Sequence, residues 1–170
     1  MTDYLENVNA DQDPFRRILS KIPGFSGYIE RTNRRDADKL LRDTLAQRFE
    51  ALWQRASEIQ RELLESGGLA YVDDIESAAI KLRTFADRIR NASYVYASLF
   101  ESIKVNEQEL ARLYEYDNAM LDYVDKIGAA LDNIQASIGT DGLPAAIRNL
   151  ATLSREAITA FDRREEAILS

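Results

Sequence analysis

Hydrophobic residues recur every three or four positions through most of this chain, which is the spacing of one face of an α-helix. No stretch alternates hydrophobic and polar residues with the period of two that a half-buried strand requires. The pattern therefore predicts an all-α protein.

Proline and glycine divide the helical pattern into segments. The prolines are Pro14, Pro23 and Pro144, and glycine pairs occur near residues 24–27, 67–68 and 139–142. We expect helices over residues 14–22, from about 28 or 33 to 66, over 73–105 and 106–138, and from 144 onward. The alternative to the expected break at 105–106 is one continuous helix through residue 105.

The hydrophobic stripes of the long segments have alternating steps of four and three, as in the seam of a helical bundle or coiled coil. The stripe of the second segment is Ala37, Leu41, Leu45, Phe49, Leu52, Ala56, Ile59 and Leu63. Short connections favour neighbouring helices of opposite direction. We expect an elongated up-down antiparallel four-helix bundle at residues 28–170, preceded at 1–27 by a flexible N-terminus, a short basic amphipathic helix and a turn.

Composition removes many kinds of active site. The 170 residues include no histidine and no cysteine, which excludes Ser-His-Asp and Cys-His catalysis, thiolate zinc sites and the Glu-x-x-His pairs of di-iron bundles. We therefore predict no catalytic residue, no metal ligand and no cofactor. A net charge of −7 also argues against a nucleic-acid partner.

The start of the chain lacks the basic and apolar regions of a signal peptide, and no apolar run approaches the length of a membrane span. This predicts a cytoplasmic protein, with a membrane-peripheral position as the alternative. Residues 13–35 carry six basic and two acidic side chains, so this segment has a charge of +4 and the remainder −11.

The basic segment is the first candidate site. It could fold back onto acidic faces of its own bundle, dock in a partner's groove, or lie on an anionic membrane. The candidate docking residues are Phe15, Arg16, Arg17, Ile18, Leu19, Lys21, Ile22, Arg34 and Arg35.

Asp117 is the second candidate because it occupies a position of the hydrophobic seam. A carboxylate in a core needs donors, since an unpaired buried charge is costly. Folding about residue 105 places Asp117 opposite residue 93, near Arg88 or Arg90. The expected neighbours form either a polar pocket or a hydrogen-bonded knot that fixes helix register. They are Ser93, Tyr94, Tyr96 and Tyr114.

One family resemblance is carried by two sets of residues. The first is Ile22-Pro-Gly-Phe-Ser-Gly-Tyr28 followed by Arg34-Arg-Asp-Ala-Asp-Lys-Leu-Leu-Arg42, and the second comprises segments 92–100 and 110–117. Over roughly residues 14–125 the chain resembles a family of uncharacterised bacterial helical proteins. The resemblance implies a bacterial source and a helical fold, and it transfers no activity.

These observations predict a non-enzymatic interaction or scaffold protein. Its partners would be other proteins or a second copy of the chain, because the long seams could also pair between molecules. One alternative is a peripheral membrane protein that docks through its basic helix. The other is a small-ligand site or enzyme around Asp117 and the nearby tyrosines.

Overall fold

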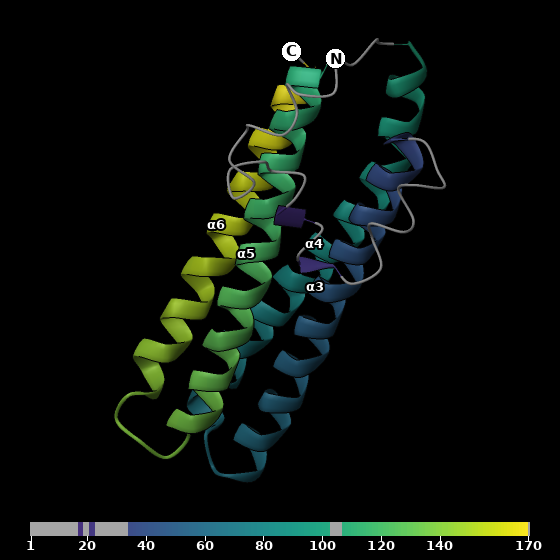
Figure 1. Ribbon diagram of the computed structural model, residues 1–170. Coiled ribbons are helices and arrows are strands. Elements are labelled where there is room, and N and C mark those ends of the chain that lie inside the picture. The colour runs from purple at the N-terminus through teal and green to yellow at the C-terminus, as the bar shows by residue number, and fades with distance from the viewer. Residues whose placement is uncertain (1–16, 19–20, 23–33, 103–106, 170) are drawn as a thin grey trace.

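The computed structural model describes residues 17–18, 21–22, 34–102 and 107–169, which contain four long helices and no strand (Figure 1). The all-α class is confirmed for this part of the chain. Most of the predicted N-terminal helix and its turn lie outside the described residues. The helices are α3 (Arg34–Glu65), α4 (Leu69–Ser102), α5 (Glu107–Ser137) and α6 (Leu143–Leu169).

Most helix boundaries lie where proline, glycine and capping residues placed them. α3 is described from Arg34 onward, and both of its expected starts, Tyr28 and Asn33, lie outside the described residues. α4 and α5 are separate helices on either side of residues 103–106, which include the expected link and lie outside the described part. α6 begins one residue before Pro144, so the proline occupies a first-turn position where its missing N–H is harmless.

The start of α4 differs from the expectation. We expected Asp73, but α4 begins at Leu69. Gly67 adopts a φ of +84°, which closes α3 in a tight turn, and the N–H of Gly68 donates to the carbonyl of Leu63 at 2.7 Å. The helix then starts at once because Tyr71 and Val72 pack against the core. This burial outweighs the local capping signal at Asp73.

Contacts between the helices define two hairpins, α3–α4 and α5–α6, that are stacked on each other. Along α3, Glu50 pairs with Arg90 and Trp53 with Arg83, so the partner numbers on α4 fall as those on α3 rise. Between α3 and α5, contacts join residues 73 to 77 positions apart, and α4 meets α6 with a separation of 74 at one ion pair. At these contacts, residues of the second hairpin lie beside residues of the first that are 73 to 77 positions earlier in the sequence.

This stacking differs from the expectation that successive helices are always neighbours. The extensively packed pairs of described helices are α3 with α4, α5 with α6, α3 with α5, and α4 with α6. α4 and α5 follow one another in the chain but occupy opposite corners of the arrangement. When one hairpin lies flat on the other in the same orientation, α3 faces α5 and α4 faces α6. α4 and α5 then lie diagonally across the bundle.

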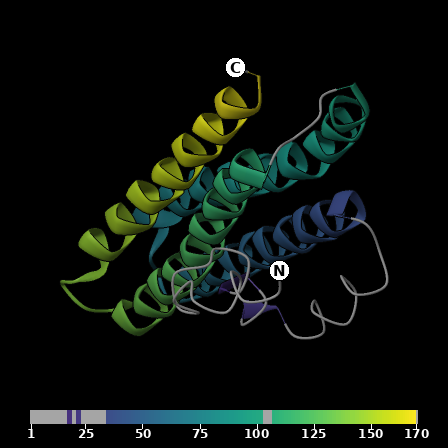
Figure 2. The same cartoon turned by 45° about the horizontal axis from the view of Figure 1, so that its top comes forward.

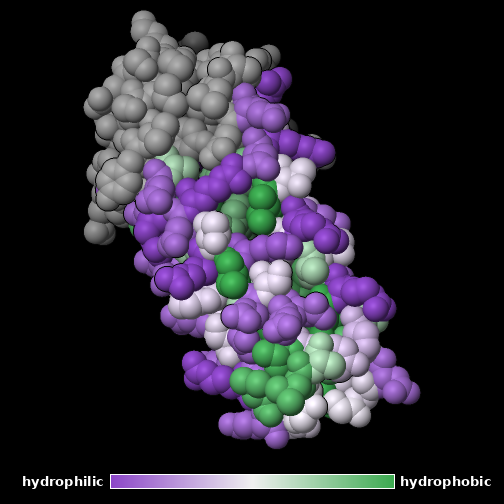
Figure 3. Space-filling view, turned by 180° about the vertical axis from the view of Figure 1, so that it is seen from behind, coloured by the Kyte–Doolittle hydropathy of each residue, from purple (hydrophilic) through white to green (hydrophobic). Residues whose placement is uncertain are grey.

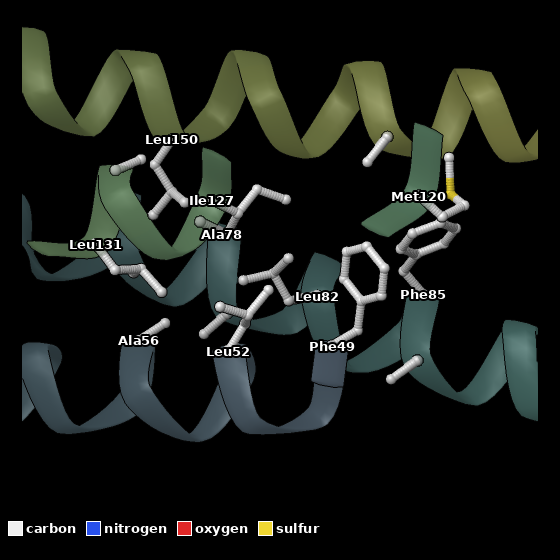
Figure 4. Packing of buried hydrophobic residues seen from close by; sticks show 14 of the residues in the cluster. Phe49, Leu52, Ala56, Ala78, Leu82, Phe85, Met120, Ile127, Leu131 and Leu150 are labelled. Atoms are coloured by element: carbon white, nitrogen blue, oxygen red, sulfur yellow. The ribbon is translucent and has the colours of Figure 1, made fainter. Parts of the chain in front are cut away.

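The core lies between the four helices and is built from the predicted stripes (Figure 4). Three phenylalanines cross its middle. The ring of Phe85 on α4 meets Phe49 of α3 edge-on at 4.8 Å and Phe161 of α6 at 5.4 Å between centroids. Edge-to-face pairs of this kind add to the stabilisation from burial alone. Phe85 thus joins both hairpins.

Replacing Phe85 should destabilise the whole bundle. We expect Phe85→Ala to lower the free energy of unfolding by about 3–5 kcal/mol, measured by urea denaturation, because it leaves a cavity among three helices. The exposed neighbour Thr84 supplies the control, since Thr84→Ala should change stability by no more than about 0.5 kcal/mol. A loss below about 1 kcal/mol for Phe85→Ala would contradict this description of the core.

Candidate functional site: a buried ion pair between α5 and α6

Asp117 is completely buried and pairs with a residue that the sequence did not single out. The Nε of Arg164 on α6 donates to Oδ1 of Asp117 on α5 at 2.9 Å. Each side chain is about 1% exposed, so the ion pair lies out of reach of water. Charge-assisted hydrogen bonds are strong in such surroundings. The pair therefore couples α5 to α6 directly.

Two other buried polar side chains belong to the same helices, Asn118 beside Asp117 and Ser154 ten residues before Arg164. The amide of Asn118 donates to the carbonyl of Tyr114 at 3.0 Å, and both residues are buried. On α6, the hydroxyl of Ser154 donates to the carbonyl of Leu150 at 2.8 Å. Because these hydrogen bonds are made within one helix, the buried donors need no acceptor on a neighbouring helix.

A second buried arginine lies at the level of the ion pair. Arg42 on α3 is 2% exposed, and it precedes Asp117 by 75 positions. Contacts between α3 and α5 join residues 73 to 77 apart, so this register brings Arg42 level with Asp117. The charged residues of three helices thus lie in one layer of the bundle.

The structure brings some of the predicted site residues to this layer. Tyr114 is buried one turn before Asp117, as expected. The expected alternative donors Arg88 and Arg90 instead form ion pairs elsewhere, with Asp162 and Glu50. The hydrogen bond to Glu50 raises the pKa of Arg90 above its ordinary value. Ser93, Tyr94 and Tyr96 belong to α4, but their side chains are outside the described set.

Arg164 was missed although the sequence contains a signal for it. The seam of α6 reads Ala157, Phe161 and then Ile168, a step of seven that skips one position. Arg164 fills the skipped position, with steps of three and four to its neighbours. A basic residue at a core position of α6 and an acidic one at a core position of α5 could have been paired by charge.

The basic N-terminal segment is described at four residues. Ile18 and Ile22 are buried in the core, and the Nζ of Lys21 lies 2.8 Å from Oδ1 of Asp122 on α5. Arg48 of α3 also donates to the carbonyl of Lys21 at 3.2 Å, while Arg17 is exposed. These four residues are therefore folded back on the bundle.

The other candidate docking residues receive no side-chain description. Phe15, Arg16 and Leu19 lie outside the described residues, and for Arg34 and Arg35 only the backbone of α3 is described. The described part of the chain contains no cluster of three or more acidic side chains arranged to hold a metal ion. None of its helices is long and apolar enough to cross a membrane.

Three hollows lined by described residues lie away from Asp117. One of about 350 Å³ lies between α4 and α6 and includes Tyr71, Lys81 and Arg148. One of about 440 Å³ lies between α5 and α6 beside Tyr123, and a smaller one of about 200 Å³ adjoins Trp53. Neither Asp117 nor Arg164 lines any of these three hollows, so a molecule bound in them would not contact the ion pair.

No family model, no curated protein and no solved structure matches this chain. The resemblance to bacterial helical proteins therefore remains a prediction based on the quoted residues. Function has to be argued from the surfaces and the buried charges of the molecule.

The ion pair should behave as a structural unit. Asp117→Leu or Arg164→Met removes one partner and leaves the opposite charge buried without it. Each change should lower the free energy of unfolding by about 3–5 kcal/mol. The double variant removes both charges and should be far less destabilised than the sum of the single variants. Urea denaturation of the four proteins measures this cycle, and additive losses would contradict a direct coupling.

Proposed function

We propose that this protein is a non-enzymatic interaction or scaffold protein whose first hairpin, α3–α4, pairs with a second copy of the chain. The supporting observation is a group of large aliphatic side chains that the fold leaves in water. Leu69 is 68% exposed, Ile80 55% and Leu64 49%. Large apolar side chains gathered on a surface are typical of interaction sites.

These residues share one region of the hairpin. Leu69 and Ile80 are eleven positions apart, about three helical turns, so they lie on the same face of α4. Leu64 lies just before the turn that joins α3 to α4. Figure 3 shows hydrophobic residues gathered at the end of the molecule where this turn lies. We call Leu64, Leu69 and Ile80 the aliphatic patch.

The finer architecture belongs to the same proposal. The partner numbers that fall from α3 to α4 support an antiparallel, up-down first hairpin in an elongated four-helix bundle. Those that rise from α3 to α5 indicate that these two neighbouring helices run parallel, so the proposed bundle is antiparallel within each hairpin. The hydrogen bond from the N–H of Ile22 to the carbonyl of Ile18 at 3.1 Å supports a short additional N-terminal helix. We further propose a bacterial protein, as the resemblance implies, and a cytoplasmic location, which fits the lack of cysteine.

The burial of Asp117 favours interaction over catalysis. A general acid or base must reach a substrate proton directly or through one water molecule. The Asp117 side chain is about 1% exposed and is hydrogen-bonded to Arg164. This supports the register-fixing role and leaves the small-ligand or enzyme function without a favourable observation.

Self-association should depend on the aliphatic patch. We expect the protein to form dimers in sedimentation equilibrium at protein concentrations of about 0.1 mM, and the double variant Leu69→Glu/Ile80→Glu to be monomeric. Two charges in a contact that excludes water oppose its formation. Ala129→Glu, at an exposed position of α5, is the control and should dimerise like the unchanged protein. Monomers throughout, up to about 1 mM, would contradict the proposal.

Membrane docking through residues 14–22 makes a different prediction. Because Ile18 and Ile22 are buried in the core, they are not available to an acyl layer in this arrangement. The intact protein should therefore remain in the supernatant when vesicles rich in phosphatidylserine are pelleted at low salt. Pelleting that is lost on deleting residues 1–22, and absent with phosphatidylcholine vesicles, would establish the membrane alternative instead.

A further inference from the structure

The outward side of α6 carries an unusual row of side chains. Arg148, Thr152, Arg155, Thr159 and Arg163 follow one another with steps of four, three, four and four, so they share one face of the helix. All five are exposed. Figures 1 and 2 show α6 at one side of the bundle, beside α5. We call these five residues the arginine face.

The three guanidinium groups of this face have no ion pair with any residue that the structure describes. Other arginines of the protein do have one, including Arg88 with Asp162 and Arg164 with Asp117. α6 also carries Glu156, Glu165 and Glu166. The two whose side chains are described, Glu156 and Glu166, are exposed and form no ion pair with these arginines. Glu166 follows Arg163 by three positions and so shares this face of α6. The excess of positive charge is local to the hollow between α5 and α6, where Arg155 and Arg163 outnumber Glu156.

The hydroxyls of the two threonines donate to the backbone of their own helix, so they are not free donors for a ligand. The hydroxyls of Thr152 and Thr159 donate to the carbonyls of Arg148 and Arg155 at 3.1 and 3.0 Å. One guanidinium nitrogen of Arg155 in turn donates to the Thr152 oxygen at 3.4 Å. The remaining hydrogen-bond donors of this face are therefore the guanidinium groups, whose forked geometry suits carboxylates and phosphates.

A hollow beside the face supplies an apolar contact. It has a volume of about 440 Å³ and lies between α5 and α6, with Arg155 and Arg163 among its lining residues. Tyr123 and Ala160 contribute apolar surface to it, and Glu156 also lines it. The Nζ of Lys126 lies 5.3 Å from the centre of the Tyr123 ring, which adds another cation at this edge.

The spacing of the arginines distinguishes between anionic partners. Steps of seven and eight residues separate successive arginines by about 10–12 Å along the helix axis. Glutamates at every seventh position of a second helix repeat at about 10.5 Å, and so match the arginines one to one. Phosphates follow each other at about 3.4 Å along a nucleic-acid strand, which is a denser row. Small apolar residues between the glutamates would fill the hollow beside Tyr123.

We propose that the arginine face binds an acidic amphipathic helix of a partner protein, which lies along α6 and over the hollow at Arg155 and Arg163. Arg148 lines the separate hollow between α4 and α6 and marks the far end of this face. This goes beyond the self-association proposed above, because it concerns the second hairpin and a different kind of partner. Leu69→Glu/Ile80→Glu should leave binding at the arginine face unchanged, so the two proposals can fail separately.

The test is a titration of the full-length protein followed by the NMR signals of the arginine Nε–H groups. The probe is an alanine-based helical peptide with glutamates at every seventh position. We expect its addition at low salt to shift the signals of Arg148, Arg155 and Arg163. The double variant Arg155→Ala/Arg163→Ala should weaken binding about tenfold, as expected for the loss of two exposed charge pairs. Salt near 0.5 M should weaken it as well.

Matched controls decide the outcome. The same peptide with glutamine in place of glutamate should produce no shift, and Arg61→Ala, at an exposed position of α3, should bind the acidic peptide like the unchanged protein. Equal shifts with both peptides, or equal weakening by Arg61→Ala, would overturn the proposal. Tighter binding of an oligothymidylate or of phosphatidylserine vesicles at these arginines would also overturn it, in favour of a nucleic acid or a membrane.

Discussion

Asp117 and Arg164 are held out of contact with water, so their charges are stabilised by each other and by the polar groups packed around them. Moving α6 by even one turn relative to α5 would separate the two charges inside the core, at a cost of several kcal/mol. Apolar seams alone tolerate such slippage, because one leucine position resembles the next. We therefore propose that the ion pair fixes the register on which the packing of the second hairpin depends.

The same register extends to the first hairpin. Arg42 lies level with Asp117, and further along the bundle Arg55 donates to the carbonyl of Gly128 at 3.2 Å and pairs with Asp132. Phe85 connects the hairpins in the middle of the core through its contacts with Phe49 and Phe161. Polar contacts thus specify how the hairpins align, while the phenylalanines and aliphatic side chains supply most of the burial that stabilises them.

The two hairpins present different surfaces to water. The first exposes the aliphatic patch near its turn, which suits a contact driven by removal of apolar surface from water. The second exposes the arginine face, which suits an anionic partner and depends on ionic strength. A bundle with two surfaces of unlike chemistry fits the proposed interaction or scaffold function.

The sequence by itself determined the helical class, the positions of most helix ends and the identity of the core stripes, because helical periodicity, proline and glycine are local properties. It also identified Asp117 as a charge in the core. Its partner was not found, since Arg164 lies on another helix and the pairing depends on how the hairpins align. The start of α4 at Leu69, the separation of α4 from α5 and the exposure of Arg148, Arg155 and Arg163 were likewise decided by tertiary structure. In each case the deciding factor is burial or exposure against a distant part of the chain, which no local pattern contains.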